Sequence, residues 1–408
     1  MRRRREARAG LMSFRGAGFT LFLGALSVLP PLAIDASLPS LPTIEAQFGA
    51  SPAETAAVIA IFIAGCSTAP LAVGPLADRY GRKPLMLTGL ALFVLCGLGC
   101  ALAPSITALL GFRLLQGVGA GAVGILPRAI IRDLFEGREA RLQLAAVSIV
   151  FSAGPLVAPS LGAAILAFGD WRTIFAALVV VGVAIALAAL FGFRESHPPA
   201  NRRSIRPAAV VASFRRALTN RMCVGFSLLG GFAFAGLFAY VNVSPLLFMQ
   251  GFGLSKAGFA ALFAATASGV IFGSSINAWL LNRHAKPKLV LDAALCALPL
   301  PGLAILAITF AGAASPFPVA AAVMVYITIF GLIFPNAVHE AIHPLPEIAG
   351  VASAVVQTVQ MLFGALGGMV AATIYRDGSP LAIGLVMSAG SLVAAAIYAV
   401  WLRSAVED

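Results

Sequence analysis

The sequence predicts an all-α integral membrane protein whose twelve transmembrane helices form two pseudo-symmetric six-helix bundles. Three observations lead to this prediction. Of the 408 residues, 60% are hydrophobic and 11% are charged, and the mean hydropathy is +0.95, whereas a soluble domain carries about 25% charged residues. Apolar runs long enough to span a bilayer recur along the chain. The two halves of the sequence also share a loop pattern.

Apolar runs separated by Pro, Gly and charge clusters predict the individual helices. Each such helix satisfies its backbone hydrogen bonds internally, as the bilayer requires. Many of the 41 Gly and 25 Pro residues fall within the runs, where small residues allow close packing and Pro residues allow kinks. The predicted centres lie near residues 27, 65, 94, 117, 156, 182, 235, 268, 300, 327, 361 and 391.

The basic residues predict the orientation of these helices. Of the 28 Lys and Arg residues, 24 fall in the terminal segments and in the connections that share their side of the membrane, and 3 fall on the other side. Short loops rich in Lys and Arg stay in the cytoplasm, so both termini are expected to be cytoplasmic. The net charge of +12 is then expected to face the anionic lipid of the bilayer rather than nucleic acid. We expect the first apolar run to be a retained helix and not a cleaved signal.

The longest polar interruption divides the predicted helices into six and six. It predicts an N-terminal six-helix bundle over residues 1–193, a cytoplasmic linker loop over 194–220 and a C-terminal six-helix bundle over 221–408. The segment NRHAKPKLVL (282–291) aligns with DRYGRKPLML (78–87) at an offset of 204, half the chain length. Tandem repeats of this kind build secondary transporters with a site between the halves.

The first of these loops, GPLADRYGRKP (74–84), resembles the signature loop of the major facilitator superfamily (MFS). Gly74 permits close helix contact and Gly81 permits a tight turn. The resemblance implies the MFS fold, in which the charges of Asp78, Arg79 and Arg82 latch the two halves at the cytoplasmic face of the outward-open form. The alternative is a solvated loop that only fixes the orientation.

Two further segments are similar to motifs of the same superfamily. FRLLQGVGAGAVGILPRAIIRDLF (112–135) looks like its fourth-helix motif, and SAGPLVAPSLGAAI (152–165) is similar to its antiporter motif. The second similarity implies a pliable, kinked segment that bends as the carrier changes its access state. Gly162 is followed by Ala163 where the family has Gly-Gly, so the close packing at that point is open. The gating residues expected in this helix are Gly154, Pro155, Pro159 and Gly162.

A finer resemblance connects most of the chain with the Bcr/CflA family of drug and proton antiporters. It rests on the segments IDASLPSLP, RAIIRDLF, WRTIF (171–175), YVNVSPLLF (240–248), FPNA (334–337) and AGVASAV (349–355). It implies an exporter of drugs or other small amphipathic molecules in a bacterial inner membrane, driven by the proton gradient and without a cofactor. We expect a monomer. A carrier of a physiological metabolite such as an amino acid, a peptide or a sugar is the alternative on the same fold.

One carboxylate, Asp35, lies within the apolar stretch PPLAIDASLPSLP (30–42). An acid inside a span is costly and marks a proton or substrate site by default. The alternative is an interfacial position, because the 20 residues from Arg15 already cover roughly 30 Å and the helix can break at Pro39. The family resemblance places the acid in the central cavity. We therefore expect Asp35 and Arg113 to couple protons, while Arg113 has the alternative role of a cross-helix hydrogen-bond donor.

Aromatic and amide side chains in the spans are the candidates for substrate binding. GGFAFAGLFAYVNVSP (230–245) offers an aromatic wall with one amide, which suits bulky apolar or cationic compounds. Packing against lipid or neighbouring helices explains the aromatic residues equally, and interhelical hydrogen bonds explain the amides. The candidates are Gln116, Phe232, Phe234, Phe238, Tyr240, Asn242, Asn277, Asn336, Gln357 and Gln360.

The segment HEAIH (339–343) matches the His-Glu-x-x-His signature of zinc proteases. Pro344 and Pro346 follow directly, and the sequence offers no third ligand on the same side of the membrane. The five Cys residues are scattered through apolar runs, which is typical of packed thiols. We therefore expect no metal site and no enzyme activity.

Overall fold

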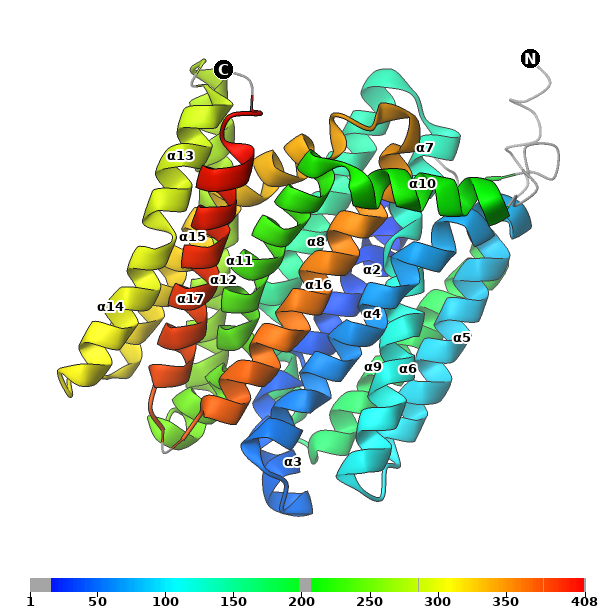
Figure 1. Ribbon diagram of the computed structural model, residues 1–408. Helices are drawn as coiled ribbons and strands as arrows, with labels where there is room; N and C mark the ends of the chain where they lie inside the picture. The colour runs from blue at the N-terminus through cyan, green and yellow to red at the C-terminus, as the bar shows by residue number, and fades with distance from the viewer. Residues whose placement is uncertain (1–15, 198–206, 285, 377, 407–408) are drawn as a thin grey trace, which may run out of the picture.

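The computed structural model describes residues 16–197, 207–284, 286–376 and 378–406, and its regular structure within these ranges is entirely helical. Twelve helices in the described residues are long and apolar enough to cross a membrane. Each predicted centre falls inside one of these spans, so the prediction of a twelve-helix membrane protein is confirmed. Figure 1 shows the spans side by side, with the helix α10 lying across their ends.

The first six spans follow one another through short connections, and Pro residues divide two of them. Pro39 lies in the first turn of a short 3₁₀ helix in the first span, and Pro127 lies in the first turn of α7 in the fourth, where its missing N–H is tolerated. The elements are α2 (Ala17–Asp35), η1 (Leu38–Ser40), α3 (Leu41–Phe48), α4 (Pro52–Tyr80), α5 (Arg82–Ala101), α6 (Ile106–Gly124), α7 (Leu126–Leu134), α8 (Gly137–Ile165), α9 (Trp171–Leu187) and the π-helix η2 (Ala188–Gly192).

The last six spans repeat this arrangement after the helix α10 (Pro207–Thr219). Pro299 divides the ninth span into two helices. The elements are α11 (Arg221–Pro245), η4 (Leu246–Gly251), α12 (Lys256–Asn282), α13 (Pro287–Ala297), α14 (Pro299–Phe310), α15 (Pro316–Ile342), η5 (Pro346–Ile348), α16 (Ala349–Ile374), α17 (Leu381–Ile397) and the π-helix η6 (Tyr398–Leu402).

Short polar side chains begin several of the spans. Ser51 accepts a hydrogen bond from the backbone N–H of Glu54, whose carboxylate accepts one from the Ser51 N–H in return, which is a capping box. Ser105, Asn220 and Ser255 cap α6, α11 and α12 through single bonds of the same kind. These caps satisfy backbone donors that helix starts leave open.

Glycines set the closest contacts between the spans. A Cβ atom added to Gly117 on α6 would lie 2.1 Å from the backbone oxygen of Phe62 on α4, and one added to Gly65 would lie 2.2 Å from the oxygen of Leu114. In the second half, a Cβ on Gly273 of α12 would lie 2.0 Å from the oxygen of Thr328 on α15. Backbones therefore touch directly at these positions, as small residues in membrane helices allow.

The two halves meet along α4 with α16 and along α8 with α12. The Thr358 hydroxyl on α16 donates to the backbone oxygen of Ser67 on α4 at 2.8 Å. At the end that carries α3, called here the opposite end, η1 contacts α11 and α12, and α3 contacts η4. Leu38, Leu41 and Ile44 are fully buried in that region. The end that carries α10 and the turn between α4 and α5 is called the basic end (Figure 1).

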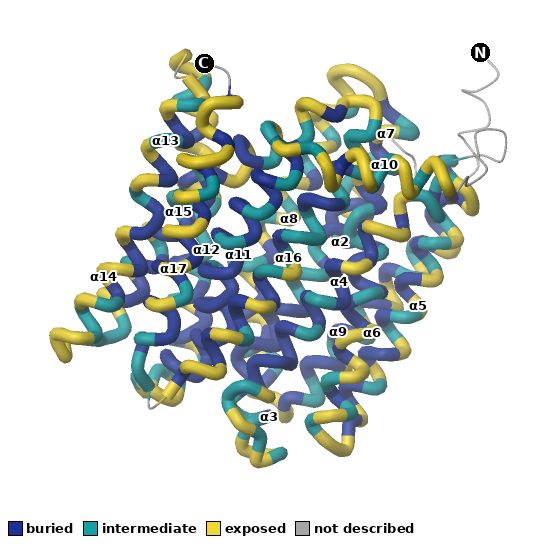
Figure 2. The backbone as a smooth tube through the Cα atoms, in the orientation of Figure 1, coloured by how far each residue is buried: buried dark blue, intermediate teal, exposed yellow. Residues whose placement is uncertain are grey.

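The predicted linker loop contains a helix that the sequence prediction did not include. Residues 207–219 form α10, which contacts α16 and α11, while residues 198–206 lie outside the described part of the chain. Its Ala, Val and Phe residues recur with a helical period between the arginines. Figure 2 shows that much of α10 is exposed, whereas most turns of the span α11 are buried.

Gly117→Val is expected to destabilise the protein because the new side chain collides with the backbone of α4. Overpacking of this kind costs about 1–3 kcal/mol. Gly111→Val in the same helix is the control, because a Cβ there meets nothing within 4 Å, and it should change the free energy of unfolding by less than about 0.5 kcal/mol. Thermal unfolding of both variants in detergent, followed by tryptophan fluorescence, measures the difference. Equal melting temperatures would contradict the close contact.

Candidate functional site

Asp35 is the last residue of α2, and its side chain is buried, with 6% of its surface exposed. The span does not end there, because η1 and α3 carry it on to Phe48. The 13 residues from Asp35 to Phe48 correspond to about 20 Å of helix. The helix α2 ends at Asp35, but Pro39 does not terminate the span. That Asp35 lies in the central cavity and not at the membrane interface stays a prediction. The carboxylate lies inside the span.

The Asp35 carboxylate has no hydrogen bond or ion pair within the described part of the chain. It lies within electrostatic reach of the Tyr240 hydroxyl on α11, and this hydroxyl shares a 2.7 Å hydrogen bond with the Thr266 hydroxyl on α12. Asp35 belongs to the first half of the chain, and Tyr240 and Thr266 belong to the second. The acid therefore lies where the two halves face each other.

Arg113 is fully buried on α6, and its hydrogen bonds join three helices. Its guanidinium donates to the backbone oxygen of Val58 on α4 at 3.0 Å, to that of Ala33 on α2 at 3.4 Å and to the Oε1 of Gln116 at 3.0 Å. It also lies over the ring of Phe62, 4.2 Å from the centroid. This geometry is that of a cross-helix donor. Within the described residues its hydrogen-bond acceptors are all neutral, and it forms no ion pair with Asp35.

The aromatic candidates of α11 pack in three groups, and Tyr240 stacks on Phe263 of α12 with ring centroids 5.6 Å apart. Phe234 contacts Phe330 and Phe334 of α15, with ring centroids 5.1 and 5.8 Å away, and Phe238 of its own helix at 5.9 Å. Phe232 makes an edge contact with Phe363 of α16 at 4.9 Å. Phe330, Phe334 and Phe363 were not among the sequence candidates, because their spans carry no local signal that distinguishes them from lipid-facing aromatics.

The amide candidates differ in how far their polar atoms are satisfied. Asn336 donates to the Oδ1 of Asn277 at 2.7 Å, so these two residues join α15 to α12. Gln116, Asn242 and Gln360 are buried, and each has one polar atom without a partner in the described residues: Nε2, Oδ1 and Nε2, respectively. An unpaired buried polar group costs about 1–3 kcal/mol, and these three atoms are buried without a hydrogen-bond partner in the described residues. Gln357 is half-buried.

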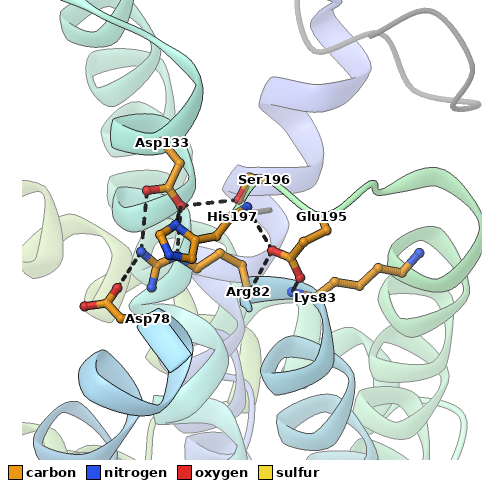
Figure 3. A network of polar contacts seen from close by, with 7 residues as sticks. All are labelled: Asp78, Arg82, Lys83, Asp133, Glu195, Ser196 and His197. Carbon is orange, nitrogen blue, oxygen red and sulfur yellow. Dashed lines mark hydrogen bonds and ion pairs between the residues drawn. The ribbon is translucent and has the colours of Figure 1, made fainter. Parts of the chain in front are cut away.

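The signature loop at the basic end forms an ion-pair network, shown in Figure 3. Arg82 is buried, with 2% of its side chain exposed, and its guanidinium lies 2.8 Å from Asp133 at the end of α7 and 2.8 Å from Asp78 on α4. His197 Nδ1 lies 3.9 Å from the same Asp133 carboxylate. A buried guanidinium with two carboxylates at this distance is strongly held. The network thus fixes α4, α5 and α7 to one another.

Glu195, just after the sixth span, closes the network from the other side. Its carboxylate accepts hydrogen bonds from the backbone N–H groups of Arg82 and Lys83 at 2.8 and 3.1 Å, which lie at the start of α5 where a negative charge is favoured. The Lys83 ammonium donates to the backbone oxygens of Leu190 and Phe193 at 2.8 and 2.7 Å. The start of α5 and the end of the sixth span are therefore tied together.

This network differs from the predicted latch between the halves. In the described residues, the Arg82 guanidinium binds carboxylates of the first half, and its backbone N–H binds Glu195 of the linker. Arg79 lies over the ring of its neighbour Tyr80. Gly81, with a φ of 101°, makes the turn. Asp133 and Glu195 were not among the residues predicted from the sequence. Asp133 lies inside RAIIRDLF, a segment that carries the family resemblance, so the sequence contained a pattern that could have identified it. Glu195 lies at the start of the polar linker, where no motif distinguishes it.

The segment with the antiporter motif packs directly on the helix that carries Asp35. A Cβ atom added to Gly162 would lie 2.1 Å from the backbone oxygen of Ala36, and one added to Gly154 would lie 2.6 Å from Val28. Pro155 and Pro159 lie inside the same helix, α8. The close helix packing expected from the family's Gly-Gly pair is therefore present here, although the second residue is Ala163. Gly162 alone provides it.

The HEAIH segment forms the end of α15. The rings of His339 and His343 lie 5.4 Å apart, and both residues are exposed. The described residues contain no group of three or more His, Cys, Asp or Glu side chains placed to hold a metal ion. Tyr398 lies within electrostatic reach of Glu340, so this segment is part of the packing at the basic end.

Comparisons with known proteins agree with this architecture. A family model described as Major Facilitator Superfamily matches residues 21–368. A bicyclomycin resistance protein homolog of Haemophilus influenzae is 29% identical over 88% of this chain and 90% of that protein. The multidrug resistance protein MdtL of Escherichia coli K12 is 30% identical over 89% of this chain and 90% of its own length. The resemblance to the Bcr/CflA branch is thereby confirmed.

Two further comparisons are partial or concern the fold alone. The uncharacterized MFS-type transporter YdgK of Bacillus subtilis is 36% identical over 62% of this chain, and the match covers 64% of that protein, less than two thirds. The crystal structure of a mutant of the nucleoside transporter NupG has a TM-score of 0.74 at 15% identity and covers 93% of this chain and 99% of that one. A D-xylose-proton symporter has a TM-score of 0.70 at 16% identity, with coverages of 93% and 97%. The predicted fold is confirmed.

Asp133→Asn is expected to lower the free energy of unfolding by about 1–3 kcal/mol, because it removes a charge that a buried guanidinium faces. The control is Glu347→Gln, which breaks the ion pair between Glu347 and Arg216, whose side chains are 68% and 54% exposed. Exposed pairs contribute about 0–1 kcal/mol. Thermal unfolding in detergent compares the two variants. If the exposed pair proved the more important one, the network in Figure 3 would not stabilise the fold.

Proposed function

We propose that this chain, which belongs to the Major Facilitator Superfamily, exports drugs or other small amphipathic molecules in exchange for protons. The observation that carries the proposal is the Asp35 carboxylate, buried between the halves without a hydrogen bond or ion pair in the described residues. Relatives named for bicyclomycin and multidrug resistance supply the substrate class. As a superfamily member, the chain is a transporter and not an enzyme.

The chemistry of the acid supports an exchange of one cargo for one proton. A carboxylate without partners in an apolar site is costly, and either a proton or a cationic ligand can neutralise it. When Asp35 faces the cytoplasm, it releases its proton as the cargo binds. When the halves rock and Asp35 faces outward, a proton from outside displaces the cargo. Proton and cargo thus compete for one site, which is sufficient to couple their movements.

The aromatic and amide groups near this interface suit an amphipathic cargo. Phe234 and Phe238 supply a polarisable apolar wall on α11, and aromatic faces also attract cations. The unpaired amide atoms of Gln116, Asn242 and Gln360 supply hydrogen-bonding groups that orient a cargo. Phe232, Tyr240, Asn277, Asn336 and Gln357 remain proposed members of the same lining.

The contacts at the two ends support a conformation whose site faces the basic end. The opposite end is packed where η1 and α3 meet α11, α12 and η4. At the basic end, the carboxylates that pair with the Arg82 guanidinium in the described residues, Asp78 and Asp133, belong to the first half. We infer that Asp78, Arg79 and Arg82 engage the second half only after the carrier turns outward. Gly154, Pro155, Pro159 and Gly162 form the flexible part of α8 in this change.

The proposal also includes how the chain is placed in the cell. Residues 1–193 and 221–408 form the two moving halves, and residues 194–220 connect them. The basic end faces the cytoplasm of a bacterial cell, in agreement with the distribution of Lys and Arg, so both termini are cytoplasmic in the inner membrane. A monomer is sufficient for this cycle, since both halves of the site belong to one chain.

Asp35→Asn is expected to abolish proton-driven transport while leaving cargo binding in place, because the amide keeps the size of the side chain but cannot release a proton. Inside-out membrane vesicles energised by respiration, with ethidium and bicyclomycin as the compounds, measure the uptake. The control is Asp170→Asn, because Asp170 is an exposed helix cap and Asn caps equally well.

Two results would contradict different parts of the proposal. Undiminished proton-driven uptake by Asp35→Asn would remove Asp35 from the coupling mechanism. If the unaltered protein is correctly folded but takes up neither ethidium nor bicyclomycin, export of these drugs is contradicted. A metabolite is then favoured as the cargo.

A further inference from the structure

The helix α10 has apolar side chains on two of its sides. Phe214 and Ala217 face the bundle: Ala217 is fully buried and Phe214 packs against the core. Val211 and Leu218 face away from it, with 65% and 56% of their surfaces exposed. They are seven residues apart and thus share one face of the helix, two turns from each other. A helix that only bridged two domains through water would carry polar residues on its outer side.

The position of α10 places this outer face at the boundary of the membrane. The helix ends at Thr219, Asn220 caps the next helix, and the seventh span starts at Arg221. Figure 1 shows α10 running across the spans at the basic end and not along them, and it contacts α16 and α11. Its axis therefore lies at the level of the first turn of a membrane span. Amphipathic helices that lie in the interface plane have this orientation.

The positive charge of α10 and of the residues that follow it favours contact with anionic lipid. Residues 207–221 include Arg215, Arg216 and Arg221 and no acidic residue. Arg216 pairs with Glu347 at 2.6 Å, and the Arg221 guanidinium donates to the backbone oxygen of Trp401. Arg215 is exposed, has no ion pair in the described residues, and follows Val211 by four residues on the same face of α10. A free guanidinium beside two exposed apolar side chains suits the phosphate of an anionic lipid.

We propose that α10 is an interfacial helix that binds anionic phospholipid. Val211 and Leu218 insert between the acyl chains, and the Arg215 guanidinium contacts the phosphate group. The connection between the halves is then held by the membrane on its outer side and by α16 on its inner side. This proposal concerns a lipid contact of the linker region and does not depend on the identity of the cargo.

The test measures which lipid lies beside α10 in vesicles that contain equal amounts of phosphatidylcholine and phosphatidylglycerol. A bimane label is attached to Val211→Cys in the full-length protein with Cys296→Ala, because Cys296 is the exposed cysteine among the described residues and the other four are buried. Two samples of identical composition are compared. In one, the phosphatidylcholine carries a quenching nitroxide near the head of its acyl chain, and in the other the phosphatidylglycerol carries it.

We expect phosphatidylglycerol to quench the label more strongly, with a local enrichment that Arg215→Gln reduces by up to about fivefold, since one arginine near a membrane contributes about 1 kcal/mol. The matched control for charge is Arg216→Gln, which is expected to leave the enrichment nearly unchanged, because Arg216 already has a carboxylate partner. The control for position is a label at Ala209→Cys, which lies about 200° away around the helix and should be quenched weakly by both lipids.

Two results would overturn the proposal. If neither lipid quenches the label at position 211 more than the label at position 209, the outer face of α10 does not lie in the membrane. If both lipids quench the label at position 211 equally while Arg215 is present, the helix inserts its apolar residues without recognising an anionic headgroup.

Discussion

The burial of one carboxylate without a partner is the physical constraint on which this structure depends. In a bilayer, backbone and side-chain polar groups must be satisfied within the protein, and most of the described polar groups near the middle of this protein are satisfied. Arg113 reaches three acceptors, Asn336 pairs with Asn277, and Tyr240 pairs with Thr266. Asp35 is a buried acid that has neither a hydrogen bond nor an ion pair in the described residues. The surrounding helices hold it in that position, because the backbone of Ala36 touches α8 directly at Gly162.

In each half, a residue that follows the last span binds the third span of that half at the basic end. The chemical groups that make this contact differ between the halves. In the first half, Glu195 after the sixth span binds the start of the third span. In the second half, the Arg403 guanidinium after the twelfth span binds the Asp292 carboxylate of the ninth at 2.9 Å, whereas Glu195 binds backbone N–H groups. The sixth and the twelfth span both end in a π-helix. A duplicated fold can therefore keep a contact while its residues change, which explains why the second copy of the signature loop is poorly preserved in the sequence.

Sequence reasoning predicted the spans well because length and apolarity determine them. All twelve centres were placed correctly, although Pro39, Pro127 and Pro299 divide three spans into shorter helices. It missed α10, since a polar segment with arginines appeared to be a loop, and it missed Glu195, since a partner 113 residues from Arg82 leaves no local pattern. Three-dimensional packing decided the remaining questions. Phe234 packs against aromatic rings of α15, and Arg113 donates to three neutral acceptors. Residue spacing along one helix does not reveal contacts between helices.

The central claim is that the proton and the cargo compete for Asp35. The most direct test is the number of protons released when bicyclomycin or ethidium is added to the purified protein in weakly buffered solution, compared between the unaltered protein and Asp35→Asn from pH 5 to 9. The account predicts release from the unaltered protein over the part of this range in which Asp35 is protonated, and no release from the variant although it still binds the compound. Equal release from both proteins would contradict the account and would place the coupling group elsewhere in the chain.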